Sequence, residues 1–117
     1  MYSAVRRYEG VTDPTEAAKR VREEFVPFIS GLPGFVEYYW IDLGQNVMLS
    51  VSVFDSLPNA IDGNQSAVAW VRANMASVLP QNPRVESGKV VAHKNASGSS
   101  TVRPFGEQRK PAPRPKF

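Results

Sequence analysis

Residues 31–56 form the most constraining stretch of the chain, because two strand-like segments there surround a single turn. The segments Phe35 to Ile41 and Val47 to Phe54 are rich in β-branched and aromatic residues. Between them, Leu43-Gly44-Gln45-Asn46 supplies the residue types that tight turns favour. This stretch therefore predicts a β-hairpin.

A two- or four-residue loop pairs Asp42 with Val47 and gives the hairpin two unlike faces. The nearly apolar face consists of Val36, Tyr38, Trp40, Val47, Leu49, Val51 and Val53. The mixed face consists of Phe35, Glu37, Tyr39, Ile41, Met48, Ser50, Ser52 and Phe54. We expect helices to cover the apolar face and a second copy of the chain to cover the mixed face. The predicted homodimer interface is Phe35, Tyr39, Ile41, Met48 and Phe54.

The segments around the hairpin complete a β-α-β-β-α-β order. Residues 2–9 alternate as a strand does, and Asp13-Pro14-Thr15-Glu16 has the pattern of a helix N-terminus. We expect Pro27 to limit or bend this first helix near residue 26. A second helix is predicted from Ser56, and an extended segment from Arg84 to His93. This order predicts a ferredoxin-like α+β fold with both helices on one face of the sheet.

Composition limits the class of protein. A chain of 117 residues fits one domain, and the lack of cysteine excludes a disulfide framework and thiolate metal sites. The N-terminal residues MYSAVRRYEG show neither a signal peptide nor a membrane span, so we expect a cytoplasmic protein with no membrane partner.

The basic charge belongs to the C-terminal tail, residues 94–117. This tail carries a net charge of +5, whereas residues 1–93 carry −2. Its Pro, Ser and Gly content predicts disorder, and it follows a domain of residues 1–93. We expect the tail either to be a passive extension or to dock on an acidic protein partner, and nucleic acid is not expected. The predicted docking residues are Phe105, Arg109, Lys110, Arg114 and Phe117.

Three segments, REEFVPFISGLPGFVEYYWID, VMLSVSVFDS and AVAWVRANM, resemble the antibiotic biosynthesis monooxygenase superfamily of dimeric α+β barrels. The resemblance covers residues 1–93 and implies a pocket between sheet and helices in each protomer. Members of this superfamily include cofactor-free oxygenases of polycyclic phenols and haem-degrading enzymes. The resemblance matches Trp70 to a helix tryptophan of the phenol oxygenases, but Ser66 stands where those enzymes have an asparagine, so that amide is missing unless Asn64 substitutes for it. The haem degraders' strand asparagine and helix histidine are both missing here.

Four candidate site residues each have a structural alternative. Tyr38 and Trp40 can stack on an aromatic ligand beside Ser66, or can be ordinary core aromatics. Trp70 can position a substrate, or can be a buried edge or dimer contact. His93 is the sole histidine and a candidate general base, or an exposed residue near the chain end.

Arg6 and Arg7 can neutralise an anionic substrate, although such arginines beside an acidic residue more often form a solvated or ion-paired edge. No set of His, Cys or clustered carboxylates predicts a metal site, and no cofactor is expected.

Two functions remain open from the sequence. One is a cofactor-independent monooxygenase, or a related small enzyme, that acts on an aromatic, oxidisable compound. The other is a non-catalytic dimeric module for binding or assembly whose basic tail docks on a protein partner.

Overall fold

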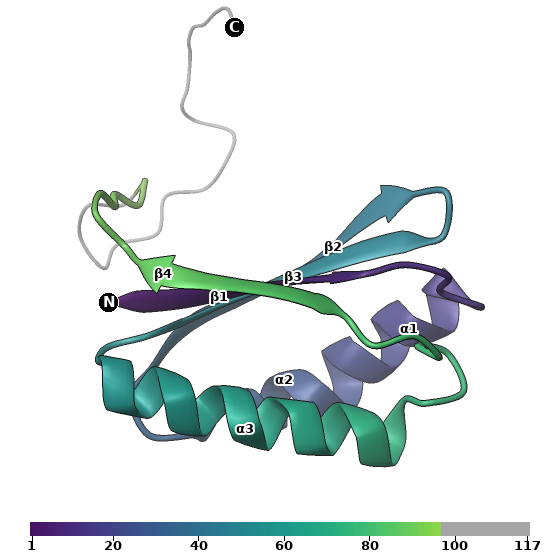
Figure 1. The fold of residues 1–117 in the computed structure, drawn as a ribbon, viewed down its shortest axis with the longest axis horizontal. Coiled ribbons are helices and arrows are strands. Elements are labelled where there is room, and N and C mark those ends of the chain that lie inside the picture. The colour runs from purple at the N-terminus through teal and green to yellow at the C-terminus, as the bar shows by residue number, and fades with distance from the viewer. Residues whose placement is uncertain (97–117) are drawn as a thin grey trace, which may run out of the picture.

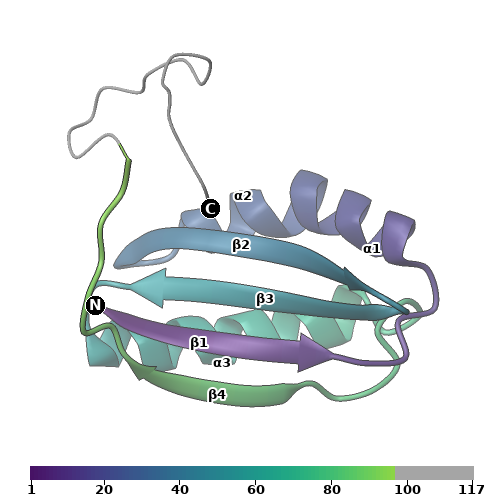
Figure 2. The same cartoon turned by 90° about the horizontal axis from the view of Figure 1, so that it is seen from above.

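The computed structural model describes residues 1–96, which form a four-stranded antiparallel sheet with the helices on one face (Figures 1 and 2). The strand order in the sheet is β2-β3-β1-β4. No helix within residues 1–96 is long and apolar enough to cross a membrane. The ferredoxin-like β-α-β-β-α-β prediction is confirmed. The elements are β1 (Tyr2–Tyr8), α1 (Pro14–Arg20), a π-helical turn (Val21–Phe25), α2 (Val26–Ser30), β2 (Phe35–Gly44), β3 (Val47–Phe54), α3 (Leu57–Asn74) and β4 (Arg84–Lys89).

The predicted basic tail falls largely beyond the part of the chain that the structure describes. Its proposed docking residues Phe105, Arg109, Lys110, Arg114 and Phe117 all lie outside the described residues. The docking of the tail on an acidic protein therefore stays a prediction.

Both long helical segments begin at the predicted capping residues. The Asp13 carboxylate accepts a hydrogen bond from the Glu16 N–H at 3.0 Å. The Ser56 hydroxyl accepts a hydrogen bond from the Asn59 N–H at 3.3 Å. Each cap satisfies a backbone donor that the first helical turn would otherwise leave unpaired.

Pro27 was expected to limit or bend the first helical segment near residue 26, and it does not end it. The helix geometry changes there instead, and the chain stays helical through Pro27 to Ser30. The π-helical turn stands directly before α2, and there the Val26 N–H bonds to the carbonyl of Val21. A π turn is wider than an α turn and gives the proline ring the room that an α-helix interior denies it.

The β2–β3 hairpin forms as predicted, but its register differs by one residue. Asp42 pairs with Met48 and not with Val47. A two-residue turn with positive φ values of 56° and 62° joins the strands. The ladder shifts between Asp42 and Gly44, which leaves Leu43 as an extra residue on β2. The prediction assumed an unbroken ladder and therefore missed this shift.

The register change reverses the two faces of β3, because side chains alternate along a strand. Met48 and Phe54 were predicted for the open face and the dimer interface, and this prediction is wrong. Each of them is 1% exposed and belongs to the core under the helices. Leu49 and Val51, predicted to face the helices, alternate with them and lie on the open face instead.

The β2 residues of the predicted interface lie partly on the open face of the sheet and partly in the core under the helices. Tyr39 and Ile41 lie on the open face and are 52% and 38% exposed. Phe35 packs against the core instead, and its ring centroid lies 6.1 Å from that of Phe54 in an edge-on arrangement.

Gly63 and Phe54 set the close packing between α3 and β3. Gly63 is buried on the side of α3 that faces the sheet. A Cβ atom at this position would overlap the ring of Phe54. Glycine therefore serves close approach here, at some cost in helix propensity.

Strand β4 ends at Lys89, earlier than the predicted extended segment, and residues 90–96 form what we call the C-terminal arm. The arm crosses the open face of the sheet at the end where β1 begins (Figures 1 and 2). The Val90 N–H donates to the Met1 carbonyl at 2.9 Å. Val53 lies on this open face but is only 5% exposed. One end of the open face is thus occupied within the chain itself.

Candidate functional site

The helix-facing side of the sheet carries polar side chains at its centre. Ser50 on β3 pairs with Arg6 on β1 and with Trp40 on β2, so these three residues form one row across the sheet. Arg6 is 3% exposed and Ser50 is 2% exposed. In the adjacent row, Ser52 is 1% exposed and pairs with Tyr38. Because helix-covered sheet faces are usually apolar, these buried polar groups are candidates for function.

Several polar atoms of this region have no hydrogen-bond partner. The Arg6 guanidinium donates from Nη2 to Oδ1 of Asn64 on α3 at 2.5 Å. Arg6 Nε, Trp40 Nε1 and Ser52 Oγ are buried without a partner among residues 1–96. A buried unpaired polar atom costs on the order of 1–3 kcal/mol, and a bound ligand can remove that cost.

Two buried phenols stand beside the Arg6 guanidinium. Burial raises the pKa of Tyr8, against the opposing charge of Arg6. Burial and the proximity of Tyr8 raise the pKa of Tyr38 far above its ordinary value, although a hydrogen bond with Ser50 and the Arg6 charge oppose this rise. Both phenols therefore remain neutral at physiological pH. The Tyr8 ring centroid also lies 5.4 Å from that of Trp40.

Two cavities lie between α3 and the β1–β4 side of the sheet. The first cavity has a volume of about 350 Å³, and Tyr8, Val85 and Val71 line it together with the loop that follows α3. The second cavity has a volume of about 200 Å³, and Asn64 and Ser87 are among its lining residues. The Arg6–Asn64 hydrogen bond joins β1 to α3 between the two cavities. Tyr8 borders the first cavity, and Asn64 borders the second.

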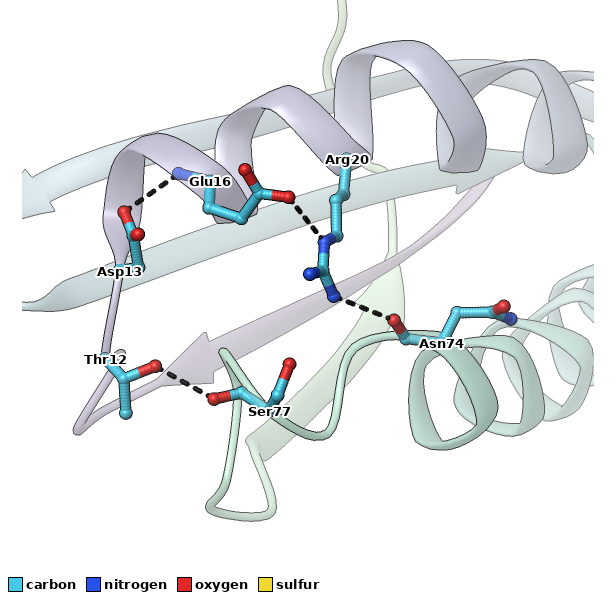
Figure 3. A network of polar contacts seen from close by, with 6 residues as sticks. All are labelled: Thr12, Asp13, Glu16, Arg20, Asn74 and Ser77. Atoms are coloured by element: carbon cyan, nitrogen blue, oxygen red, sulfur yellow. Dashed lines mark hydrogen bonds and ion pairs between the residues drawn. The ribbon is translucent and has the colours of Figure 1, made fainter.

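Hydrogen bonds from Thr12, just before α1, and from Arg20 in α1 hold the end of α3 and the loop after it, which forms one wall of the first cavity (Figure 3). The Thr12 hydroxyl donates to the Ser77 carbonyl at 2.9 Å. Arg20 donates from Nη1 to the Asn74 carbonyl at 3.2 Å and from Nε to the Glu16 carboxylate at 2.8 Å. These contacts hold the end of α3 against α1 and so define the cavity wall.

The structure brings some of the predicted ligand-binding residues together and separates others. Tyr38 and Trp40 occupy adjacent positions on the inner face, as predicted. Trp70 lies on another side of α3, where its ring centroid is 5.1 Å from that of Phe25. None of the four predicted residues, Tyr38, Trp40, Ser66 and Trp70, lines the first or the second cavity. Trp70 is therefore placed in the packing between α3 and the first helical segment.

His93 lies on the C-terminal arm, on the open face of the sheet. Its Nε2 atom is 3.7 Å from the Glu37 carboxylate on β2. The two cavities border the opposite face, so the structure does not bring the predicted general base to them. Within residues 1–96, no three His, Cys, Asp or Glu side chains gather into a group that could hold a metal ion.

Sequence reasoning did not single out Arg6 and Asn64 as a pair. One signal could have separated Arg6 from Arg7: along β1 the helix-facing positions Tyr2, Ala4 and Tyr8 have the same parity as Arg6. The structure follows that alternation. Arg6 points inward, whereas Arg7 forms an exposed ion pair with Glu9 at 2.8 Å.

Comparison with known proteins relates the chain to others at the level of structure. No model of a known protein family matches the chain, and no curated protein matches it. A protein of unknown function from Nitrosomonas europaea, NE2512, superposes with a TM-score of 0.66 at 18% sequence identity, over 80% of this chain and 92% of the other.

Several of the similar solved structures carry a description of activity. The monooxygenase ActVA-Orf6 of Streptomyces coelicolor, in complex with the ligand nanaomycin D, superposes with a TM-score of 0.62 at 14% identity, over 80% of this chain and 90% of that one. A second Nitrosomonas europaea protein, described as a candidate antibiotic biosynthesis monooxygenase, gives a TM-score of 0.63 at 13% identity, over 77% and 89% of the chains. The resemblance inferred from the sequence is thus confirmed in the fold, and this chain has the ferredoxin-like α+β fold of the antibiotic biosynthesis monooxygenases.

Proposed function

We propose that this protein binds a small aromatic, oxidisable compound in the first cavity and oxidises it with O₂ without a cofactor. The cavity carries the proposal. Its volume of about 350 Å³ is within the range of small-molecule sites, and its lining combines the Tyr8 ring and aliphatic side chains with the polar residues Arg72, Gln81 and Asn82. The similar structure of ActVA-Orf6 was determined with nanaomycin D, which supports a ligand of this kind.

The proposed reaction is the oxidation of a phenol with a free para position to a para-quinone. The phenol hydroxyl loses its proton, and the electron-rich ring passes an electron to O₂. A C–O bond then forms at the para carbon, and the resulting hydroperoxide loses water as the second C=O bond forms. The phenol and O₂ thus give a quinone and water, and the substrate itself supplies the electrons. The protein contributes binding, exclusion of water and stabilisation of the substrate anion.

The aromatic residues differ in how directly they act on the proposed substrate. Tyr8 contacts the substrate directly, because it lines the first cavity. Trp40 packs against the Tyr8 ring, and Tyr38 lies on the same inner face. Trp70 acts at longer range as a positioning residue through Phe25, which contacts both Trp70 and Tyr38.

Oxygen uptake with 1-naphthol tests the proposed activity. Turnover is expected to consume one O₂ for each 1,4-naphthoquinone formed, in protein from which metals have been removed by a chelator. A Val85→Trp variant fills the cavity and is expected to lose the activity, whereas Val91→Trp, at a position that is 89% exposed on the C-terminal arm, keeps it. Equal oxygen uptake by both variants would place the chemistry outside the first cavity.

The second candidate function is a non-catalytic binding or assembly module. One observation favours it: among the described residues, the lining of the first cavity contains no carboxylate and no imidazole to act as a proton acceptor. Such a module would bind 1-naphthol with a measurable dissociation constant but would leave O₂ unconsumed. Calorimetry and an oxygen electrode on the same sample separate the two functions.

We also propose that the chain forms a homodimer through the open face of its sheet. This face carries Tyr39 and Ile41 from β2, both substantially exposed, and the aliphatic residues Leu49 and Val51 from β3. An exposed apolar patch on a two-sided sheet is costly in water, and a two-fold pairing of identical faces removes it.

A further inference from the structure

The Arg6 guanidinium is a buried positive charge without an ionic partner in the described chain. Arg6 is 3% exposed, and the ion pairs formed within residues 1–96 involve Arg7, Arg20 and His93 instead. The guanidinium donates a hydrogen bond to the neutral amide of Asn64. A buried guanidinium is normally paired with a carboxylate, because desolvation of an unpaired charge is costly.

The groups around Arg6 do not supply the missing negative charge. Burial lowers the pKa of Arg6, but a guanidinium still keeps its proton in proteins. Tyr8 and Tyr38 approach it as neutral phenols, because burial raises the pKa of both. Ser50, directly opposite on β3, is neutral as well. The centre of the inner face therefore carries a positive charge that no group in residues 1–96 compensates.

Arg6 also stands beside the cavity wall. Val85 is its cross-strand partner on β4, and Tyr8 is the next residue of β1 on the same face. Both Val85 and Tyr8 line the first cavity. On the other side, Asn64 lines the second cavity and holds one end of the guanidinium. Arg6 itself lines neither cavity, and its buried Nε–H has no hydrogen-bond partner within residues 1–96.

We propose that Arg6 is the specificity-determining residue of this site and binds an anionic oxygen of an aromatic ligand, either a carboxylate or a phenolate. This inference rests on the proposed function, since it names the charge of the compound that enters the first cavity. Asn64 orients the guanidinium through its amide oxygen. The buried indole N–H of Trp40, in the same cross-strand row, is a second donor without a partner among the described residues. An incoming oxyanion would supply the acceptor that this row lacks.

The test compares charged and neutral probes of nearly the same shape by calorimetry at neutral pH. The first pair is 2-naphthoate and naphthalene-2-carboxamide. The second pair is 2,4-dinitro-1-naphthol, which is ionised at neutral pH, and its methyl ether. The wild type is expected to bind at least one anion about tenfold or more tightly than its neutral counterpart. A preference in the first pair identifies a carboxylate ligand, and one in the second pair identifies a phenolate.

The variant Arg6→Gln is expected to bind the neutral probes as the wild type does and to lose the preference for the anion. Arg7→Gln removes the same charge one residue away at an exposed position and is expected to keep that preference. A preference that survives Arg6→Gln would overturn the proposal.

One further readout keeps the outcomes separate. If Arg6→Gln does not fold, the Arg6 Nε–H resonance of the wild type is followed on addition of each probe. A shift with the anion alone supports the proposal, and no shift overturns it. Equal binding of charged and neutral probes also overturns it while leaving the proposed aromatic site intact, whereas binding of no probe rejects both.

Discussion

Arg6 and Arg7 are adjacent in the chain but lie in opposite environments. The Arg6 guanidinium is enclosed between the sheet and α3 and bonds to Asn64, whereas Arg7 bonds to Glu9 at the surface. Alternation along β1 alone accounts for this difference, because neighbouring side chains of a strand point to opposite faces. The two residues form a natural matched pair for experiments on the inner site.

Replacing Arg6 by methionine is expected to leave the free energy of unfolding unchanged or to raise it. The substitution fills a similar volume and removes an unpaired buried charge. By contrast, Asn64→Ala is expected to lower the stability by about 1–3 kcal/mol, because Arg6 then stays buried with one hydrogen bond fewer. Urea denaturation followed by circular dichroism measures both. A loss larger than about 3 kcal/mol in Arg6→Met would mean that the guanidinium has a mainly structural role.

The variant Gly63→Ala is expected to destabilise the protein by about 1–3 kcal/mol, although alanine is the better helix former. The added methyl group would overlap the ring of Phe54. Combining it with Phe54→Leu should recover part of the loss, and a double-mutant cycle of thermal or urea unfolding measures this coupling. Simple additivity of the two changes would contradict direct contact.

Ile41→Lys and Met48→Ala are expected to affect different properties. Ile41 is on the open face, so a lysine there should dissociate the proposed homodimer while each protomer stays folded. Met48 is 1% exposed in the core, so its truncation should cost about 2–5 kcal/mol of stability and leave the assembly unchanged. Analytical ultracentrifugation and urea unfolding separate these outcomes. A monomeric wild type at micromolar concentration would refute the dimer.

Stability is expected to fall at alkaline pH as the buried phenols ionise. The pKa values of Tyr8 and Tyr38 are raised in the folded protein, so the folded state holds these protons more tightly than the unfolded state. Their contribution is complete below the ordinary tyrosine pKa of about 10 and is lost progressively above it. Tyr38→Phe should therefore move the onset of alkaline unfolding upward, as ultraviolet titration and circular dichroism can follow. The exposed Tyr39→Phe serves as the control.

The sequence predicted the element order and both helix caps, because capping residues, turn residues and apolar periodicity are local signals. It did not predict the register of β2 and β3, since both faces of this hairpin are rich in apolar residues and hydropathy cannot choose between them. The extra residue Leu43 reverses β3, and the resulting inward position of Ser50 depends on that shift. Tyr38 and Trp40 were predicted correctly for the inner face, because their own strand keeps its alternation there.

The polar part of the site was harder to foresee. A serine or an arginine in a strand ordinarily marks a solvent-facing position, and here the burial of Arg6 depends on α3, a helix more than fifty residues away in the chain. The cavity beside it depends on the contacts of Thr12 and Arg20 with the end of α3. Such long-range contacts have no local sequence pattern.

The C-terminal arm also restricts how two copies of this chain can meet. Residues 90–96 stand on the open face at one end, where His93 approaches Glu37, so a second sheet has only the remainder of that face to contact. Two flat, unobstructed faces could pair with many different offsets along the sheet, but an arm at one end of the face excludes some of these offsets sterically. The arm would therefore determine the relative orientation of the two protomers more than the affinity between them. Removing the arm should allow additional relative orientations before it lowers the affinity.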